Sequence, residues 1–434
     1  MNNPTPTPSI SAHTRALLPL PQGPRLIAYA QTHHQNDVPV SLLPLVIRET
    51  GITHVIVAAI HVNEGPGNIT LNDHKPDDPR FATLWMEVAW LQGAGVKVLG
   101  MLGGAAQGSF GRLSGGDEEF EQYYLPLKSL ITTQALNGLD LDIEEPVLHP
   151  PIKRLILRLR ADFGPSFLIT LAPVAPALLP LFPHLSGPDF SYFSLESDPQ
   201  TRDAISWYNV QFYCGWGDAG TAWLYEAIVA AGWRPGRCVM GVVTNPANGS
   251  GHVETERLCG VLEYLRRRFG DGDEMGLAGS GFGGFGGVMG WEYLNSGLER
   301  SGETEPWRWV QRLGRSVRGV LEPVVMPPFP ALPDVPVYQP AAEGQPVVGN
   351  ATQQQISAPP PAAVPWTADR VRAILGGNQT EAQGEVPAQQ QSTVQMPEES
   401  KIVALVQMGF ERDIAINALV ATEGNLDMAV EMLL

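Results

Sequence analysis

Residues 136–145 read LNGLDLDIEE, and the pattern in this stretch decides how the rest of the chain is interpreted. On a β-strand, alternate side chains point to the same face. Asp140, Asp142 and Glu144 therefore share one face, while the leucines and the isoleucine between them occupy the other. Three carboxyl groups opposite an unbroken apolar face predict a buried strand that ends at a functional site.

Seven further apolar runs rich in Val and Ile occur along the chain, separated by helix-like segments or long loops. Eight such strands predict a parallel sheet closed into a (β/α)8 barrel over residues 24–321. An open doubly wound sheet is the alternative. In a barrel, the three acids face inward at the C-terminal mouth, where such folds carry their chemistry. The predicted strands are residues 25–30, 53–61, 96–102, 138–143, 167–172, 208–213, 238–243 and 287–291.

The three acids cannot all ionise without cost, because like charges raise the pKa of at least one of them. A proton is then available near neutral pH, and Glu144, which lies nearest the mouth, is the natural proton donor. A solvated acidic edge or a metal site is the alternative interpretation. An acidic edge does not fit a strand with an unbroken apolar face, and no histidine lies at ligand spacing nearby. We expect a catalytic carboxylate cluster without a metal or a cofactor.

The spacing Asn137-x-x-Asp140-x-Asp142-x-Glu144 resembles the DxxDxDxE signature of family 18 glycoside hydrolases. This family includes chitinases and endo-β-N-acetylglucosaminidases. The first acid of the signature is replaced by Asn137. That position does not protonate the leaving group, so the resemblance still implies activity, although the tuning of the acid chain could differ.

Three other places resemble the same family, so that the resemblance covers about the first three quarters of the chain. Gly103-Gly104 looks like the end of the third-strand SxGG motif, with Met101 in place of its serine. Residues 210–213 (VQFY) look like the sixth-strand tyrosine motif in the form of the short, hevamine-like branch. Residues 287–291 (GVMGW) look like the eighth-strand tryptophan motif.

The resemblance implies hydrolysis with retention and without an enzyme nucleophile. Glu144 would protonate the glycosidic oxygen, and the 2-acetamido carbonyl of the substrate would attack the anomeric carbon. Asp142 would hold the acetamido N–H, Asp140 would share a proton with Asp142, and Tyr213 would orient the acetamido oxygen. Trp291 would form the floor beneath the sugar. The expected substrate-binding residues are Trp291, Gln211 and Tyr29.

The composition changes after residue 321. Residues 322–396 are rich in Pro, Gln and Ala, and such a segment is expected to behave as an extended linker. Residues 397–434 recover helical periodicity and predict a compact bundle of three short helices.

Two features of this last segment resemble a ubiquitin-associated (UBA) domain, namely Met408-Gly409-Phe410 and the terminal Leu433-Leu434. In that family they form an apolar patch that binds ubiquitin, which makes ubiquitin the expected partner. Apolar side chains exposed on so small a bundle fit a binding surface. A bundle that has kept the fold but lost the partner is the alternative.

The formal net charge of −17 argues against nucleic acid as a partner. Three scattered cysteines, an N-terminus unlike a signal peptide and the lack of a membrane-spanning segment predict a cytoplasmic protein. Chitin lies outside the cell. A cytosolic endo-β-N-acetylglucosaminidase that cleaves the chitobiose core of N-glycans is therefore the alternative to a chitinase. A non-catalytic adaptor that links N-acetylglucosamine-containing glycans to ubiquitin is the alternative of another class.

Overall fold

Eight parallel strands close into a barrel in the computed structural model, which describes residues 23–179, 184–270, 284–297, 305–319 and Lys401. The first strand pairs with both the second and the last strand of the barrel, so the eight parallel strands form a closed ring. The predicted (β/α)8 barrel is confirmed, and the open doubly wound alternative is wrong. In spatial order the strands are β1 (Arg25–Ala30), β11 (Gly287–Trp291), β10 (Cys238–Val243), β9 (Trp207–Gln211), β8 (Leu168–Leu171), β7 (Gly138–Asp142), β6 (Lys97–Gly103) and β4 (His54–Val62).

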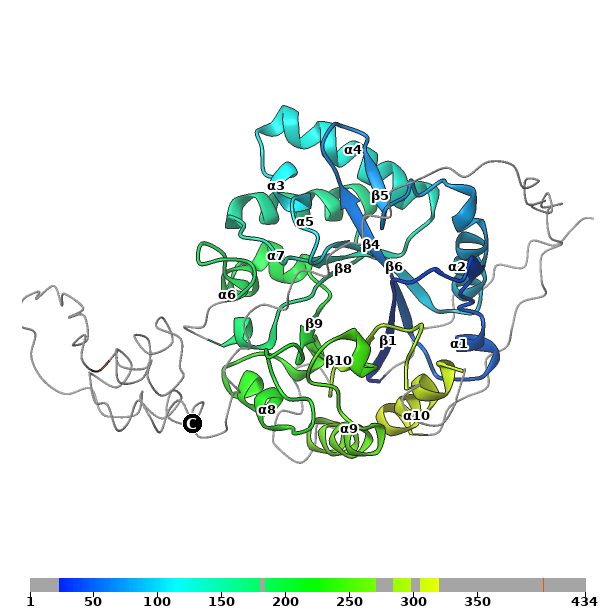
Figure 1. Cartoon of the computed structure of the whole chain (residues 1–434). Coiled ribbons are helices and arrows are strands. Elements are labelled where there is room, and N and C mark those ends of the chain that lie inside the picture. Colours follow the sequence, from blue (N-terminus) through cyan, green and yellow to red (C-terminus); the bar gives the residue numbers. More distant parts are fainter. Residues whose placement is uncertain (1–22, 180–183, 271–283, 298–304, 320–400, 402–434) are drawn as a thin grey trace, which may run out of the picture. The chain divides into compact units, whose positions relative to one another are not determined.

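Helices surround the strands, as Figure 1 shows. Short 3₁₀ helices occur in several connections. The α-helices are α1 (Pro44–Ile47), α2 (Ala82–Gly93), α3 (Ser109–Arg112), α4 (Asp117–Thr133), α5 (His149–Phe163), α6 (Tyr192–Ser197), α7 (Pro199–Ala204), α8 (Trp223–Ala230), α9 (Thr255–Phe269) and α10 (Trp307–Arg318); the 3₁₀ helices are η1 (Pro79–Phe81), η2 (Ala175–Leu178), η3 (Pro235–Arg237) and η4 (Pro246–Asn248).

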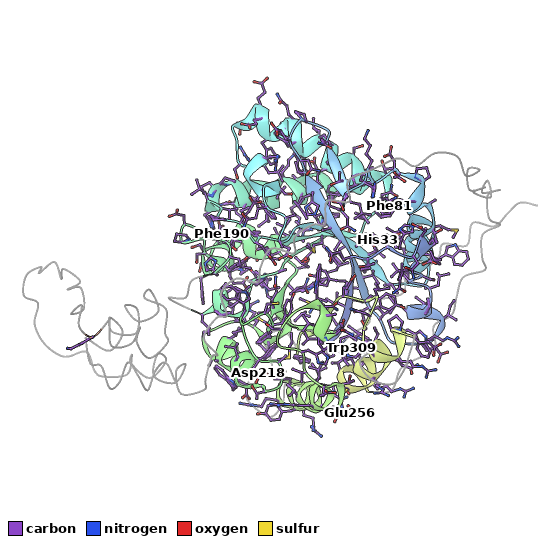
Figure 2. All side chains as sticks on the ribbon, viewed as in Figure 1. His33, Phe81, Phe190, Asp218, Glu256 and Trp309 are labelled. Atoms are coloured by element: carbon purple, nitrogen blue, oxygen red, sulfur yellow. The ribbon has the colours of Figure 1, made fainter. Side chains whose placement is uncertain are left out.

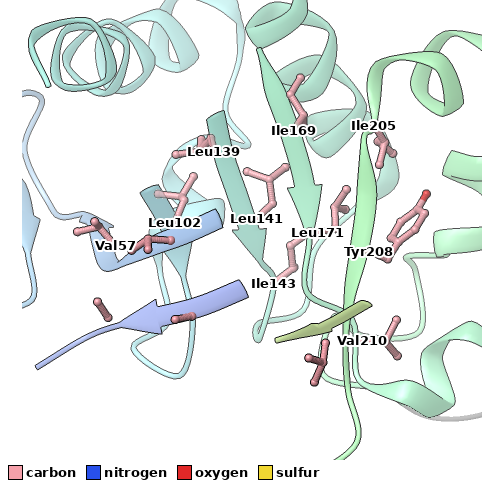
Figure 3. Close-up of a cluster of buried hydrophobic side chains, with 14 of the residues drawn as sticks. Val57, Leu102, Leu139, Leu141, Ile143, Ile169, Leu171, Ile205, Tyr208 and Val210 are labelled. Atoms are coloured by element: carbon pink, nitrogen blue, oxygen red, sulfur yellow. The ribbon is translucent and has the colours of Figure 1, made fainter. Parts of the chain in front are cut away.

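The strand side chains alternate between two apolar clusters. The outward-facing cluster packs beneath the helices and includes Leu139 and Leu141 of β7 and Leu171 of β8, which Figure 3 shows. The inward-facing cluster fills the barrel. It contains Ile27, Tyr29, Ile56, Ala58, Ala59, Leu99, Met101, Trp207, Tyr213, Val239, Val243 and Met289. The acids of β7 therefore lie among apolar neighbours.

Two short elements at the mouth were not predicted from the sequence. β2 (His34–Gln35) and β3 (Val38–Pro39) form an antiparallel hairpin after β1. Its turn residues, Asn36 and Asp37, have φ values of 50° and 63°, a left-handed pair typical of a type I′ turn. β5 (Ile69–Leu71) runs antiparallel to β4. Both elements are too short for hydrophobic periodicity to indicate them.

The predicted linker, residues 322–396, and the predicted bundle, residues 397–434, lie outside the described residues except for Lys401. Among the helices that the structure describes, none has the length and apolar character required to cross a membrane.

Candidate active site

The carboxyl groups of β7 become more accessible toward the mouth of the barrel. Asp140 is fully buried, Asp142 is 6% exposed, and Glu144, two residues beyond the end of the strand, is half-buried. Pleating turns all three toward the interior while the intervening apolar residues join the outer cluster. Glu144 is therefore the acid best placed to meet a substrate.

Three donors from three other strands hold the Asp140 carboxylate. The Tyr29 hydroxyl donates to Oδ2 at 2.7 Å, and the Thr170 hydroxyl and Asn209 Nδ2 donate to Oδ1 at 2.5 and 3.0 Å. Trp207 Nε1 donates to Asn209 Oδ1 at 2.9 Å, which fixes the orientation of that amide. Burial raises the pKa of Asp140, and the three hydrogen bonds oppose that rise.

One amide group connects the two outer acids. Gln211 Nε2, at the end of β9, lies 3.1 Å from Asp142 Oδ1 and 3.4 Å from Glu144 Oε1. The same nitrogen lies 2.9 Å from the Ala172 carbonyl oxygen. An amide nitrogen has two protons. The Gln211 amide therefore shares its two protons among three acceptors. Its hydrogen bonds to Asp142 and Glu144 fix the two acids relative to each other.

The outer acids favour their protonated forms. Burial raises the pKa of Asp142 well above its ordinary value, and the neighbouring Glu144 and Asp140 raise it further. Burial also raises the pKa of Glu144, against the hydrogen bond from Gln211. Because the two titrations are linked, the pair retains a proton at a pH where isolated carboxyl groups have lost theirs. The site can therefore act as a general acid.

Two aromatic side chains complete the mouth above the acids. Tyr213 is 8% exposed and lies two residues beyond β9, not on the strand as the sequence suggested. Burial, Asp142 and Glu144 raise its pKa well above 10, so its hydroxyl stays a donor. Trp291 ends β11 and is half-buried against the inner cluster.

Tyr29, near the end of β1, is enclosed by other residues of the site. It is 1% exposed, its hydroxyl is held by Asp140, and its ring makes an edge contact with Trp291 at 5.6 Å between centroids. A side chain this enclosed is poorly placed to contact a sugar. Its described contacts are with Asp140 and Trp291, and substrate binding by Tyr29 stays a prediction.

Glu145, which directly follows the expected proton donor and is 9% exposed, was not predicted as a site residue from the sequence. Its carboxylate accepts the backbone N–H groups of Gly108 and Phe110 at 2.9 and 2.8 Å. Gln107 Nε2 donates to the Glu144 carbonyl at 2.8 Å. The loop after β6 is thus tied to the end of β7. The doubled acid Glu144-Glu145 was the signal available in the sequence.

Glu292 was also missed, and it performs the same task on the other side of the mouth. Its Oε2 accepts the backbone N–H groups of Gln31 and Thr32 at 3.0 and 2.8 Å, and its Oε1 accepts the Thr32 hydroxyl at 2.6 Å. These contacts fix the end of β1 beside Trp291. An acid that directly follows the expected floor residue was the only hint in the sequence.

The two departures from the family motifs leave the acids in place. Asn137 Oδ1 accepts Val98 N at 2.8 Å and Gln92 Nε2 at 3.3 Å, so its side chain joins β6 and α2 rather than the acid chain. Met101 is 2% exposed in the inner cluster. Its methyl group occupies the space where a Cβ on Gly104 would lie, only 2.6 Å away. The Met therefore fills volume next to the glycine pair.

A closed barrel with an enclosed set of carboxyl groups at its C-terminal mouth is typical of glycoside hydrolases. Among the residues that the structure describes, no three His, Cys, Asp or Glu side chains could hold a metal ion together.

Comparison with known proteins identifies the family within this class. A fungal endo-β-N-acetylglucosaminidase from glycosyl hydrolase family 18 is 45% identical, with a TM-score of 0.61, over 68% of this chain and 99% of that one. The chitinase ChiC from Aspergillus fumigatus is 49% identical, with a TM-score of 0.58, over 68% of this chain and 99% of that one. The chain belongs to glycosyl hydrolase family 18.

A curated relative and a domain model extend this comparison. "Chitinase D" of Niallia circulans is 28% identical over 170 residues, which are 35% of this chain and 31% of that protein. The chain thus matches less than a third of the length of this relative. Residues 397–433 match the UBA/TS-N domain, so the chain carries a UBA domain after its hydrolase barrel. The UBA residues singled out in the sequence lie outside the described part of the structure: Met408, Gly409, Phe410, Leu433 and Leu434.

Proposed function

We propose that the barrel hydrolyses the β-1,4 linkage between two N-acetylglucosamine units with retention, through participation of the substrate's acetamido group. This linkage occurs in chitin and in the chitobiose core of N-glycans. The observation that carries the proposal is the Asp142–Gln211–Glu144 arrangement, in which two acids with raised pKa values share one amide donor. One relative of the barrel is named for each of the two substrate classes.

In the first step, the Glu144 proton passes to the glycosidic oxygen as the bond to the anomeric carbon breaks. The acetamido carbonyl oxygen of the same sugar forms the new bond to that carbon and gives an oxazolinium ion. Asp142 accepts the acetamido N–H and stabilises the positive charge of the ring. The Tyr213 hydroxyl donates a hydrogen bond to the acetamido oxygen and orients that oxygen for attack.

In the second step, the Glu144 carboxylate takes a proton from water. The oxygen of that water bonds to the anomeric carbon, the oxazolinium ring opens, and Glu144 regains its proton. Asp140 lies deeper in the barrel than Asp142 and raises its pKa. Three hydrogen bonds stabilise the Asp140 carboxylate itself. Trp291 provides the apolar floor for the sugar, and Gln211 keeps the two acids at a fixed separation.

The test compares the wild type with Glu144→Gln on chitooligosaccharides and on a high-mannose glycopeptide, with products identified by mass spectrometry. Glu118→Gln is the matched control, because it makes the same change at an exposed acid on α4. We expect Glu144→Gln to lose at least about 10³-fold in turnover while it still binds sugar, because general acid catalysis contributes about 10²–10⁴-fold. Retained turnover in that variant would refute the mechanism.

The presence of the expected proton donor argues against the adaptor function. If the wild type binds sugar but cleaves neither substrate, the adaptor function becomes the better explanation.

We also propose that the UBA domain binds ubiquitin through Met408, Gly409, Phe410, Leu433 and Leu434. The match to the UBA/TS-N domain over residues 397–433 supports this proposal. A single small patch is expected to bind with a Kd of tens to hundreds of micromolar, or roughly −5 to −7 kcal/mol. The test titrates ¹⁵N-labelled ubiquitin with the full chain.

Met408→Ala and Phe410→Ala should abolish the chemical-shift changes of ubiquitin. Met396→Ala, which makes the same change just outside the domain, should leave them intact. Unchanged shifts of ubiquitin on addition of the wild-type chain at millimolar concentration would refute the proposal.

A further inference from the structure

A cavity of about 570 Å³ lies at the end of the barrel opposite the acids. Its lining includes Arg25, the first residue of β1, and Phe285, which comes shortly before β11. Parallel strands all begin at the same end of a barrel, whereas the acids lie where β7 ends. The helices α9 and α10 pack against each other and both end at this cavity; Figure 2 labels Glu256 on α9 and Trp309 on α10. The cavity is therefore separate from the mouth, and its volume lies in the range of small-ligand sites.

Positive charge gives this cavity its chemical character. The chain has a formal net charge of −17, yet within its described part four arginines and no acidic residue line the cavity: Arg25, Arg266, Arg267 and Arg318. The charge is also felt inside the barrel. Burial lowers the pKa of His54 well below its ordinary value, and Arg25, Lys97 and Arg318 lower it further. This end of the barrel therefore attracts anions.

Neutral groups hold two of the guanidinium groups in place. Arg25 Nη1 donates to the Gly236 carbonyl at 2.9 Å, and the Arg25 guanidinium lies 4.4 Å from the centroid of the Trp207 ring. Arg318 Nη1 donates to the Pro24 carbonyl at 2.8 Å. Burial lowers the pKa of Arg25 to about 10 and also lowers the pKa of Arg318. Carbonyl groups and an aromatic ring orient these charges but do not neutralise them, so part of the cost of burying them remains.

The two arginines of α9 have no described acid as an ion-pair partner, whereas the next residue, Arg268, pairs with Glu226 at 3.3 Å. A Cβ on Gly319, directly after α10, would lie 3.1 Å from Arg266 Nη1, so the Arg266 guanidinium reaches across to the end of α10. Its buried Nε has no hydrogen-bond partner among the described residues. Arg267 is exposed. Four cationic groups thus converge on one cavity without a described counter-charge.

The charge and shape of the cavity favour a small phosphate compound. The planar fork of a guanidinium group matches the oxygens of a phosphate and binds them in pairs. A phosphoryl dianion also offsets more of the excess charge than a single carboxylate does. The strong negative charge of the chain repels the backbone of a nucleic acid. The volume of the cavity leaves room for an organic group attached to the phosphate.

We propose that the cavity at the ends of α9 and α10 binds a phosphoryl dianion, either free phosphate or the phosphate of a small monoester. Arg266 and Arg267 contact the phosphoryl oxygens, and the anchored Arg25 and Arg318 add attraction from the barrel and from α10. This inference goes beyond the proposed hydrolase function and does not depend on it, because the cavity lies at the opposite end of the barrel. The bound anion stabilises the folded state.

The test is isothermal titration calorimetry of the full chain with inorganic phosphate, adenosine monophosphate and adenosine, at a constant ionic strength set with chloride. We expect Arg266→Gln/Arg267→Gln to raise the Kd for phosphate at least about tenfold, because charge-assisted hydrogen bonds are lost. Arg312→Gln/Arg315→Gln is the matched control. It removes the same charge from α10 at residues absent from the lining, and should change the Kd by less than about threefold.

The three compounds distinguish the source of the phosphoryl group. Equal binding of phosphate and adenosine monophosphate, without binding of adenosine, would support a site for free phosphate. Tighter binding of the monoester, again without adenosine, would support a site for a phosphate ester. Binding of adenosine, or no binding of either phosphate compound by the wild type, would overturn the inference. An equal loss in both double variants would reduce the effect to net charge and would overturn it as well.

Thermal unfolding provides a second measurement. Phosphate at about 10 mM should raise the Tm of the wild type by about 2 °C relative to chloride, for a Kd near about 1 mM, and should leave the Tm of Arg266→Gln/Arg267→Gln unchanged. If that variant does not fold, the exposed Arg267→Gln alone should raise the Kd at least about threefold, and an unchanged Kd would count against the site.

A last variant examines the acids that follow α9 in the sequence and lie outside the described residues: Asp271, Asp273 and Glu274. All three are changed to the corresponding amides. We expect this variant to bind phosphate at least as tightly as the wild type does. Binding by this variant alone would assign the arginines to the acids of the chain itself and would overturn the inference.

Discussion

Asp140→Ala is predicted to destabilise the barrel more than an ordinary polar substitution, although the wild-type carboxylate is itself costly to bury. The variant leaves three donors without their acceptor: the Tyr29 hydroxyl, the Thr170 hydroxyl and Asn209 Nδ2. All three residues are at most 1% exposed. Asn209 cannot turn its amide away, because its oxygen is occupied by Trp207.

The expected magnitude follows from these three donors. Each unsatisfied buried donor costs about 1–3 kcal/mol. Water entering the space left by the carboxyl group would relieve part of that cost, and the carboxylate no longer has to be buried. We therefore take the lower end and expect a loss of about 3 kcal/mol in the free energy of unfolding.

Asp140→Asn is the matched control. Its amide oxygen can accept from Thr170 and Asn209, and its amide nitrogen can donate to the Tyr29 hydroxyl. We expect a change of less than about 1 kcal/mol at pH 5. Burial raises the pKa of Asp140 in the folded state, so the wild type loses stability relative to Asp140→Asn as the pH rises through that raised pKa. The difference should be smallest below the ordinary pKa of aspartate.

The assay is urea unfolding of the full chain between pH 4 and pH 8, followed by the fluorescence of its tryptophans. The midpoint should move without a change in the slope of the transition. A loss below about 1 kcal/mol in Asp140→Ala would refute the reasoning, because the three donors would then have found other partners. A difference between wild type and Asp140→Asn that shrinks with rising pH would refute the electrostatic part.

Three further substitutions test the geometry of the mouth. Gly103→Ala should lower both turnover and the free energy of unfolding in urea, the latter by about 2 kcal/mol. Gly103 has a φ of +98°, and the Cβ of an alanine there would lie 2.4 Å from the Asp142 carbonyl oxygen. Unchanged kinetics would contradict this prediction. Gln211→Leu removes a hydrogen bond that lowers the pKa of Glu144. The alkaline limb of the pH profile of kcat/KM should therefore move to higher pH. An alkaline limb that stays in place or moves to lower pH would be inconsistent with this prediction. Glu145→Gln should lose about 1–2 kcal/mol in thermal unfolding while it retains measurable turnover, and complete inactivation would give Glu145 a chemical role that we do not assign.

Local sequence patterns were sufficient to predict the strands and the acids they carry. The alternation in residues 136–145 predicted which side chains face the interior, and the structure places Asp140 and Asp142 there. The runs at 25–30, 238–243 and 287–291 coincide with β1, β10 and β11. These features depend on pleating and burial, which act between near neighbours in the chain.

The supporting contacts could not be predicted, because each joins distant parts of the sequence. Tyr29 and Asp140 are 111 residues apart, and Gln31 and Glu292 are 261 apart. Burial of an aromatic strand residue was foreseeable, but its hydrogen-bond partner depends on the order in which strands meet around the barrel. For the same reason, no pattern in the sequence indicated that His33, His34, His61 and His74 line one cavity.

Closure of the barrel by its last strand has a consequence for synthesis of the chain. β11 is the neighbour that β1 and β10 share, and it is the last barrel strand to leave the ribosome. Until then, a nascent chain presents one unpaired edge on β1 and another on β10, and such edges pair readily with other chains. A fragment that ends between Val243 and Gly287 retains both edges permanently, so such truncated translation products should aggregate or require a chaperone even though they contain Asp140, Asp142 and Glu144.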